Sequence, residues 1–101
     1  MTEDKAVLSD EEIRKELETL PGWRRAGILI EKTYVFENFK QINAFLPHVA
    51  GTIVRLNHHP DLVFLPGKKS FEFTTTTHSH KAITRADIAL ARALESWTPP
   101  A

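Results

Sequence analysis

The segment "DLVFLPGKKSFEFTTTTHS", residues 61–79, decides the fold of this chain. Aromatic and β-branched residues dominate the runs on both sides of Pro66 and Gly67, which predicts two strands joined as a hairpin. Proline followed by glycine at the centre of the connection is typical of a type II turn. We therefore expect an antiparallel pair of strands here.

The second strand of this hairpin shows a clear two-residue alternation. One set of side chains contains both phenylalanines and should face the core: Phe71, Phe73, Thr75 and Thr77. The other set ends at His78, which is thereby predicted at the end of the strand on the face away from the phenylalanines.

A helix is predicted on each side of the hairpin. After it, Thr84 fits an N-cap, and Asp87 three residues later completes a capping box. Before it, residues 39–57 place apolar side chains at the 3.6-residue period of a long helix. Pro47 leaves two alternatives, one kinked helix or a break into two, and the continuing periodicity favours the kinked helix. Asn57 fits the C-terminal cap.

The first third of the chain predicts another helix and another hairpin. Residues 8–20 contain Ser9 as N-cap and Glu12 as its capping-box partner. Residues 23–36 alternate around Gly27 in the manner of two short strands. The predicted order is α-β-β-α-β-β-α, an α+β fold in which a four-stranded antiparallel sheet carries three helices on one face.

Length and composition predict one ordinary globular domain, because the 101 residues are 42% hydrophobic and 26% charged. We expect a flexible tail at residues 1–7, a single domain at 8–98 and a short tail at 99–101. Thirteen basic and thirteen acidic residues give no net field for nucleic acid. No run approaches the roughly 20 apolar residues of a membrane span, and the absence of cysteine excludes thiolate chemistry. The expected location is the cytoplasm, with neither nucleic acid nor membrane as partner.

Three histidines, His58, His59 and His78, occur at predicted element ends, where side chains from different segments can converge. Imidazole titrates near neutrality, so one neutral ring can accept a proton while a protonated ring donates one. Such a pair suits the addition or elimination of water.

Simpler interpretations stay open for each polar candidate. His58 could interact with the negative end of the helix dipole, and His78 could be an edge residue satisfied by solvent. Asp87 could serve only the helix start. We expect His48 to face solvent. His80 and His78 have the spacing of a metal pair on a strand, but no further ligand lies nearby in the sequence, so we expect no metal site.

The combination of motifs resembles the pterin-4a-carbinolamine dehydratase family. The motifs are "NHHP" (57–60), "TTTTHS" (74–79) and the Thr84-x-x-Asp87 helix start, and the resemblance runs from "PGW" (21–23) to the last helix. It implies the same α-β-β-α-β-β-α fold. It also implies dehydration of a 4a-hydroxytetrahydropterin to quinonoid dihydropterin, a step in recycling tetrahydrobiopterin-type cofactors.

The resemblance also implies roles for individual residues. His58 and His78 would be the acid/base residues, and main-chain groups near Thr76 and Thr77 would pair with the edge of the ring. The residues expected to bind substrate are His59, Pro60, Asp87, Thr76 and Thr77. The pterin is the substrate, and neither a cofactor nor a metal is implied.

One departure from the family pattern gives an alternative function. The family usually has an acidic residue one helical turn before the first histidine, and here that place is Val54. Val54 extends the apolar surface near Ala50 and Ile53, which is either a wider core stripe or a docking surface. The alternative is a catalytically weak dehydratase-like protein that acts as a binding or assembly factor. A homodimer or homotetramer is expected in either case.

Overall fold

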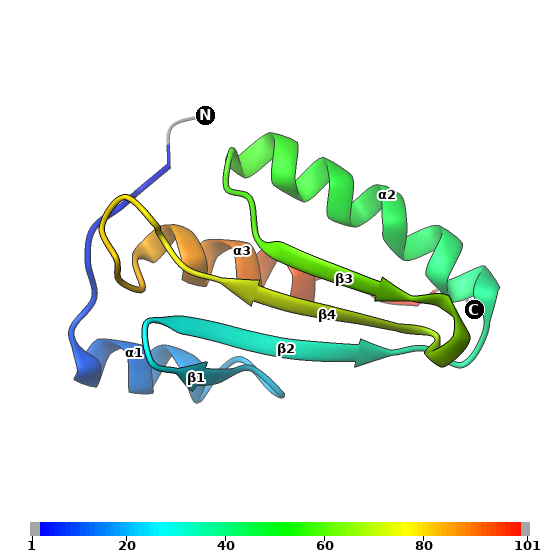
Figure 1. Ribbon diagram of the computed structural model, residues 1–101, viewed down its shortest axis with the longest axis horizontal. Coiled ribbons are helices and arrows are strands. Elements are labelled where there is room, and N and C mark those ends of the chain that lie inside the picture. Colours follow the sequence, from blue (N-terminus) through cyan, green and yellow to red (C-terminus); the bar gives the residue numbers. More distant parts are fainter. Residues whose placement is uncertain (1–2, 100–101) are drawn as a thin grey trace.

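The computed structural model describes residues 3–99, and its elements follow the predicted order (Figure 1). The helices are α1 (Asp10–Leu17), α2 (Phe39–Leu56) and α3 (Arg85–Glu95), with a short 3-10 turn, η1 (Pro66–Lys68). The strands are β1 (Arg24–Ala26), β2 (Leu29–Val35), β3 (Asp61–Leu65) and β4 (Ser70–Thr75). They form one antiparallel sheet in the order β1-β2-β4-β3. The predicted α+β class is confirmed.

The connection between β3 and β4 differs from the prediction. Leu65 pairs with Ser70, so four residues join the strands and the expected type II turn is wrong. Pro66–Lys68 form η1, and the left-handed conformation falls on Lys69, with φ of 52°, instead of on Gly67.

Aromatic packing explains this longer connection. The observed register places Phe64 opposite Phe71, and their rings stack with centroids 4.5 Å apart. A tighter turn would shift the strands and lose this cross-strand pair, because register determines which side chains meet.

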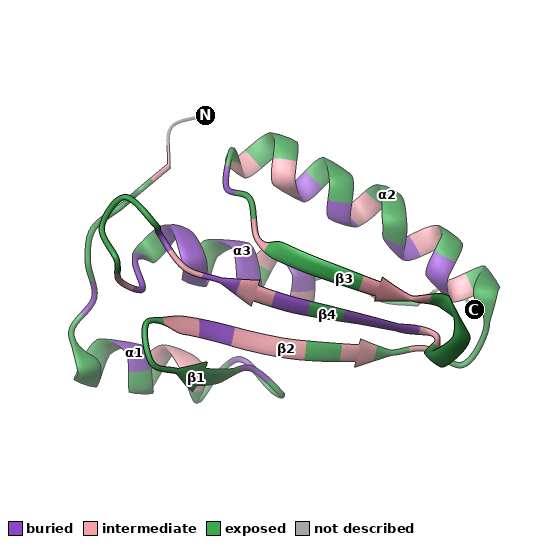
Figure 2. Ribbon diagram, in the orientation of Figure 1, coloured by how far each residue is buried: buried purple, intermediate pink, exposed green. Residues whose placement is uncertain are grey.

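The alternation of β4 separates a covered face of the sheet from an open one. Phe71 and Phe73 are 0% and 1% exposed, whereas Glu72 between them is exposed. Phe45 of α2 contacts both phenylalanine rings, with centroids 5.2 Å and 6.2 Å away. Figure 2 shows the buried residues along β4 and on α3 behind it. The core therefore lies between the helices and one face of the sheet.

The helix-end signals in the sequence are confirmed. Ser9 with Glu12 and Thr84 with Asp87 both form complete capping boxes. Asn57 is the C-cap of α2 in a left-handed conformation, with φ of 51° and ψ of 39°.

Pro47 lies inside α2, which confirms one continuous helix over two, while a kink there stays a prediction. The expectation that His48 faces solvent is wrong. Its ring is half-buried, and Nε2 lies 2.8 Å from the carbonyl oxygen of Ala93, because α2 packs against α3 at this turn.

Residues 3–8, which we call the N-terminal arm, run beside the start of α3 (Figure 1). The N–H of Leu8 donates to the carbonyl of Ile83 at 3.2 Å, and the N–H of Arg85 donates to the carbonyl of Ala6 at 3.1 Å. Flexibility of the predicted tails stays a prediction, and residues 1, 2, 100 and 101 lie outside the described part. Within residues 3–99, no helix has both the length and the apolar character needed to cross a bilayer.

Candidate active site

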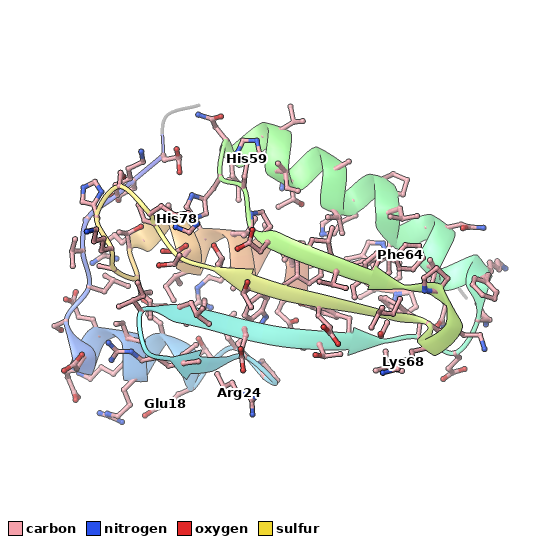
Figure 3. The ribbon with its side chains drawn as sticks, in the orientation of Figure 1. Glu18, Arg24, His59, Phe64, Lys68 and His78 are labelled. Carbon is pink, nitrogen blue, oxygen red and sulfur yellow. The ribbon has the colours of Figure 1, made fainter. Side chains whose placement is uncertain are left out.

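Two histidine-bearing segments meet at one end of the sheet. His59 follows α2 and His78 follows β4, and Figure 3 shows both at the end of the molecule nearest the arm. A pocket of about 240 Å³ lies between these segments. Its lining residues are Glu3, Lys5, Asn57, His58, His59, Thr76, Thr77, His78 and Ser79. The sequence predicted five of these as site residues.

The end of α2 separates the two adjacent histidines. Asn57 turns the chain through its left-handed conformation, and Pro60 disfavours any return to helix at the preceding residue. As a result, His58 is buried, with 5% exposure, whereas His59 is exposed. The two rings therefore have different surroundings.

Asp87 lies behind His58 and is 0% exposed. Its Oδ1 accepts hydrogen bonds from the Nε2 of His58 at 2.7 Å and the Oγ1 of Thr75 at 2.6 Å. Its Oδ2 accepts from the Oγ1 of Thr77 and the N–H of Thr84, each at 2.9 Å. One carboxylate thus serves both roles: Oδ2 caps the helix, and Oδ1 contacts His58.

The other ring nitrogen of His58 meets a second carboxylate. Nδ1 lies 2.5 Å from Oε2 of Glu3, a residue of the N-terminal arm. A neutral imidazole carries one N–H, whereas the imidazolium carries two. With a carboxylate oxygen at each nitrogen, the geometry favours the imidazolium.

Electrostatics act in the same direction as this geometry. Hydrogen bonding to Asp87 raises the pKa of His58; burial of the ring opposes this, and the Glu3 carboxylate adds to the rise. Burial of Asp87 works against ionisation, but hydrogen bonds from His58 and the neighbouring threonines outweigh it and hold the pKa of this carboxyl below its usual range. Both shifts favour an imidazolium beside a carboxylate.

Of the remaining predicted residues, some line the pocket and others lie outside it. His78 is exposed and lines the pocket, and among the described residues its ring has no hydrogen-bond partner. Thr76 donates to the carbonyl of Ile28 at 2.5 Å. Pro60 is half-buried and is not part of the pocket lining. Asp87 is likewise behind the pocket wall, so direct contact of Asp87 with a ligand stays a prediction from the resemblance, and its observed role is to hold His58.

The possible metal pair of His78 and His80 gains no further ligand among the described residues. Across residues 3–99 no group of three or more His, Asp or Glu side chains is placed to hold an ion. His80, whose spacing from His78 is that of a metal pair, has its Nδ1 2.9 Å from the hydroxyl of Ser79.

Sequence reasoning missed Glu3 and the hydroxyls that support Asp87. Glu3 belongs to a segment expected to be a loose tail, and the threonines of residues 74–77 looked like ordinary strand residues. Val54, where the resemblance implies an acidic side chain, is 80% exposed and is not part of the pocket. Besides Asp87, the carboxylate next to His58 belongs to Glu3 of the N-terminal arm.

A larger hollow of about 550 Å³ lies on the open face of the sheet. Arg24, Glu31 and Glu72 contribute charged groups to it, but it contains no histidine. The smaller pocket is the better candidate because it adjoins the buried His58–Asp87 pair and is lined by the exposed imidazole of His78, and such groups can transfer protons.

Comparisons with known proteins identify the family of this chain. Residues 6–97 match the family model described as "Pterin 4 alpha carbinolamine dehydratase". A protein of Thermomicrobium roseum named "Putative pterin-4-alpha-carbinolamine dehydratase" is 40% identical over 88% of this chain and 94% of its own. A protein of Sulfurisphaera tokodaii with the same name is 38% identical over 87% and 92%, respectively.

A solved structure shows the same fold. It is titled "Crystal structure of transcriptional coactivator/pterin dehydratase from Brucella Melitensis" and superposes with a TM-score of 0.81 at 26% identity, covering 89% of this chain and 96% of that one. The match of the family model over nearly the whole domain decides the assignment. The chain belongs to the pterin-4a-carbinolamine dehydratase family.

Proposed function

We propose that this protein dehydrates a 4a-hydroxytetrahydropterin to quinonoid dihydropterin and water. The observation that carries this proposal is that two histidines with different surroundings line the same pocket. A carboxylate oxygen lies next to each ring nitrogen of His58, which favours the protonated ring, while His78 is exposed and unpaired among the described residues.

The reaction needs one proton donor and one proton acceptor. The C4a–O bond breaks and the oxygen takes a proton, so that water leaves. The N5–H bond gives up its proton as the C4a=N5 double bond forms, and no electrons are gained or lost overall. We assign the donor role to His58, because its environment favours the charged ring, and the acceptor role to His78.

The pocket suits a small ring. Its volume of about 240 Å³ lies just below the range of about 300 to 1,000 Å³ typical of ligand sites. His59, Pro60 and the backbone near Thr76 and Thr77 are the proposed contacts to the bicyclic ring, and Asp87 acts through His58. The pterin is the substrate, and the proposed reaction uses no cofactor.

Replacing either histidine tests the assignment. His58→Ala and His78→Ala should each lower kcat by at least about 100-fold, the usual contribution of a general acid or base. The measurement follows dehydration of the 4a-hydroxypterin by its change in ultraviolet absorption.

His80→Ala is the matched control, since His80 is exposed, lies two residues from His78 and does not line the pocket. It should keep the wild-type rate. A wild-type protein no faster than buffer would refute the proposed function.

A second candidate, a binding or assembly role, is favoured by the outer surface of α2. Leu46, Ala50 and Val54 are all exposed at four-residue spacing, and Val54 is 80% exposed. Strand β3 also has a neighbour on one side only. A homodimer or homotetramer formed through these surfaces stays a proposal, as does a separate protein partner and a cytoplasmic location.

Calorimetric titration with a reduced pterin separates the two candidates. Micromolar binding that is lost in His59→Ala supports the enzyme. An assembled protein that binds no pterin supports the assembly role.

A further inference from the structure

Glu3 reaches the candidate site from a distant part of the sequence. Its carboxylate contacts Nδ1 of His58, 55 residues away along the chain, and its side chain is only 15% exposed. It also lines the pocket next to His58. A ligand entering this pocket would meet Glu3 and Nδ1 together.

The backbone of the arm makes this contact specific. Hydrogen bonds join Ala6 to Arg85 and Leu8 to Ile83, on either side of Thr84. Thr84 in turn donates its N–H to Asp87. Residues 83–85 therefore hold the arm while they cap the helix that carries Asp87, and the ring of His58 lies between the two carboxylates.

We propose that Glu3 is a positioning residue of this active site, whose carboxylate fixes the orientation of the His58 ring and, with Asp87, keeps that ring as a proton donor. The catalytic role of Glu3 rests on the proposed dehydratase function. The pairing of Glu3 with His58 is independent of it.

Both carboxylates are needed for this effect. Asp87 alone could be satisfied by a neutral ring that carries its proton on Nε2. Adding Glu3 at Nδ1 makes the second N–H favourable too, and this is the proton on the pocket side. The other charged or titratable groups along the pocket are Lys5, whose Nζ lies 3.7 Å from Oε1 of Glu3, and the rings of His59 and His78.

A titration of the free protein tests the pairing without any substrate. Ring nitrogen and carbon-bound proton signals of His58 are followed by NMR against pH in wild type, Glu3→Gln and Asp4→Asn. Glu3→Gln removes the charge at Nδ1 but keeps the size of the side chain, so His58 should lose its proton at a lower pH than in wild type. An unchanged titration would overturn the proposal.

Asp4→Asn is the matched control. Asp4 is a neighbouring carboxylate on the arm, and its Oδ1 accepts the N–H of Ala6 at 3.1 Å, a bond that the amide oxygen of asparagine can keep. The His58 titration in this variant should match wild type. A shift as large as that of Glu3→Gln would show a general effect of charge on the arm and would overturn the specific role.

Kinetics then separate positioning from a purely structural contact. In Glu3→Gln, kcat should fall by about 10- to 100-fold, the scale expected when a catalytic group is misplaced by about 1 Å, with KM within about twofold of wild type. The alkaline limb of the kcat profile should also move to lower pH, because His58 loses its proton earlier. A kcat and profile equal to wild type would overturn the proposal. A wild-type protein with no dehydratase activity would instead refute the proposed function, and the titration would still decide the pairing.

Discussion

Asp87→Asn probes the buried contacts that hold His58. The carboxylate accepts four hydrogen bonds of 2.9 Å or less, two on each oxygen, whereas an asparagine amide offers one acceptor oxygen. In either orientation of the amide, one pair of donors loses its acceptor. The threonine hydroxyls can rotate to accept from the amide. The N–H of Thr84 cannot, and His58 can accept only after losing the proton on Nε2.

The expected cost follows from these losses. A hydrogen bond to a charged group contributes about 1.5 to 3 kcal/mol, and a buried donor left without an acceptor costs about 1 to 3 kcal/mol. We expect Asp87→Asn to lower the free energy of unfolding by about 3 kcal/mol. For a domain near 100 residues, at about 4 to 8 °C per kcal/mol, the melting temperature should fall by about 12 to 24 °C.

Urea unfolding monitored by tryptophan fluorescence measures this cost, because Trp23 is 5% exposed in the folded protein and becomes solvated on unfolding. Asp10→Asn is the control: Asp10 is also an acidic residue of a first helical turn, but its side chain is 90% exposed and pairs with Arg25. Asp10→Asn should change the free energy of unfolding by no more than about 0.5 kcal/mol. If Asp87→Asn lowers the free energy of unfolding by less than about 1 kcal/mol, with an unchanged m value, the stabilising role of these hydrogen bonds is refuted.

Two further predictions concern pH and backbone conformation. Because the folded pKa of His58 is raised, its stabilisation is fully present below the ordinary value near 6.5 and is lost as the pH rises through the folded pKa. Urea unfolding should therefore show stability falling from about pH 6.5 upward, and falling less in Glu3→Gln; an equal fall in both proteins would contradict this. Gly51 lies inside α2 with open space at its Cβ position, so Gly51→Ala should stabilise by about 0.5 to 1 kcal/mol. Gly27 has equally open space but a φ of 63°, so Gly27→Ala should destabilise by about 1 kcal/mol; thermal melts that rank the two variants the other way would contradict this.

The sequence predicted the features that depend on neighbouring residues. Both capping boxes, the left-handed Asn57 and the alternation of β4 each involve residues a few positions apart, so local chemistry determines them. The order of elements followed from these signals and from the helical period of residues 39–57. The candidate histidines were found for the same reason, since they occur where predicted elements end.

The features that sequence reasoning missed depend on contacts between distant segments. The turn after β3 was predicted from Pro66 and Gly67, but its length follows from a register that pairs two aromatic rings. His48 was predicted to face solvent, because the packing of α2 on α3 that half-buries it cannot be inferred from neighbouring residues. The contact of Glu3 with His58 spans 55 residues and starts from a segment without regular structure, so no period or cap could indicate it.

Thr75, at the end of β4, and Thr77, two residues further on, link the core to the candidate site. The alternation that buries Phe71 and Phe73 continues through Thr75 and Thr77, and both hydroxyls donate to Asp87. Valine at these positions would suit a strand equally well but would leave the carboxylate with fewer donors. Those donors help to lower the pKa of Asp87 against the cost of burial, and Asp87 raises the pKa of His58, so the two threonines favour the charged form of a histidine that follows α2. The same residues therefore serve the core and the surroundings of His58, which explains why composition alone could not distinguish the two roles.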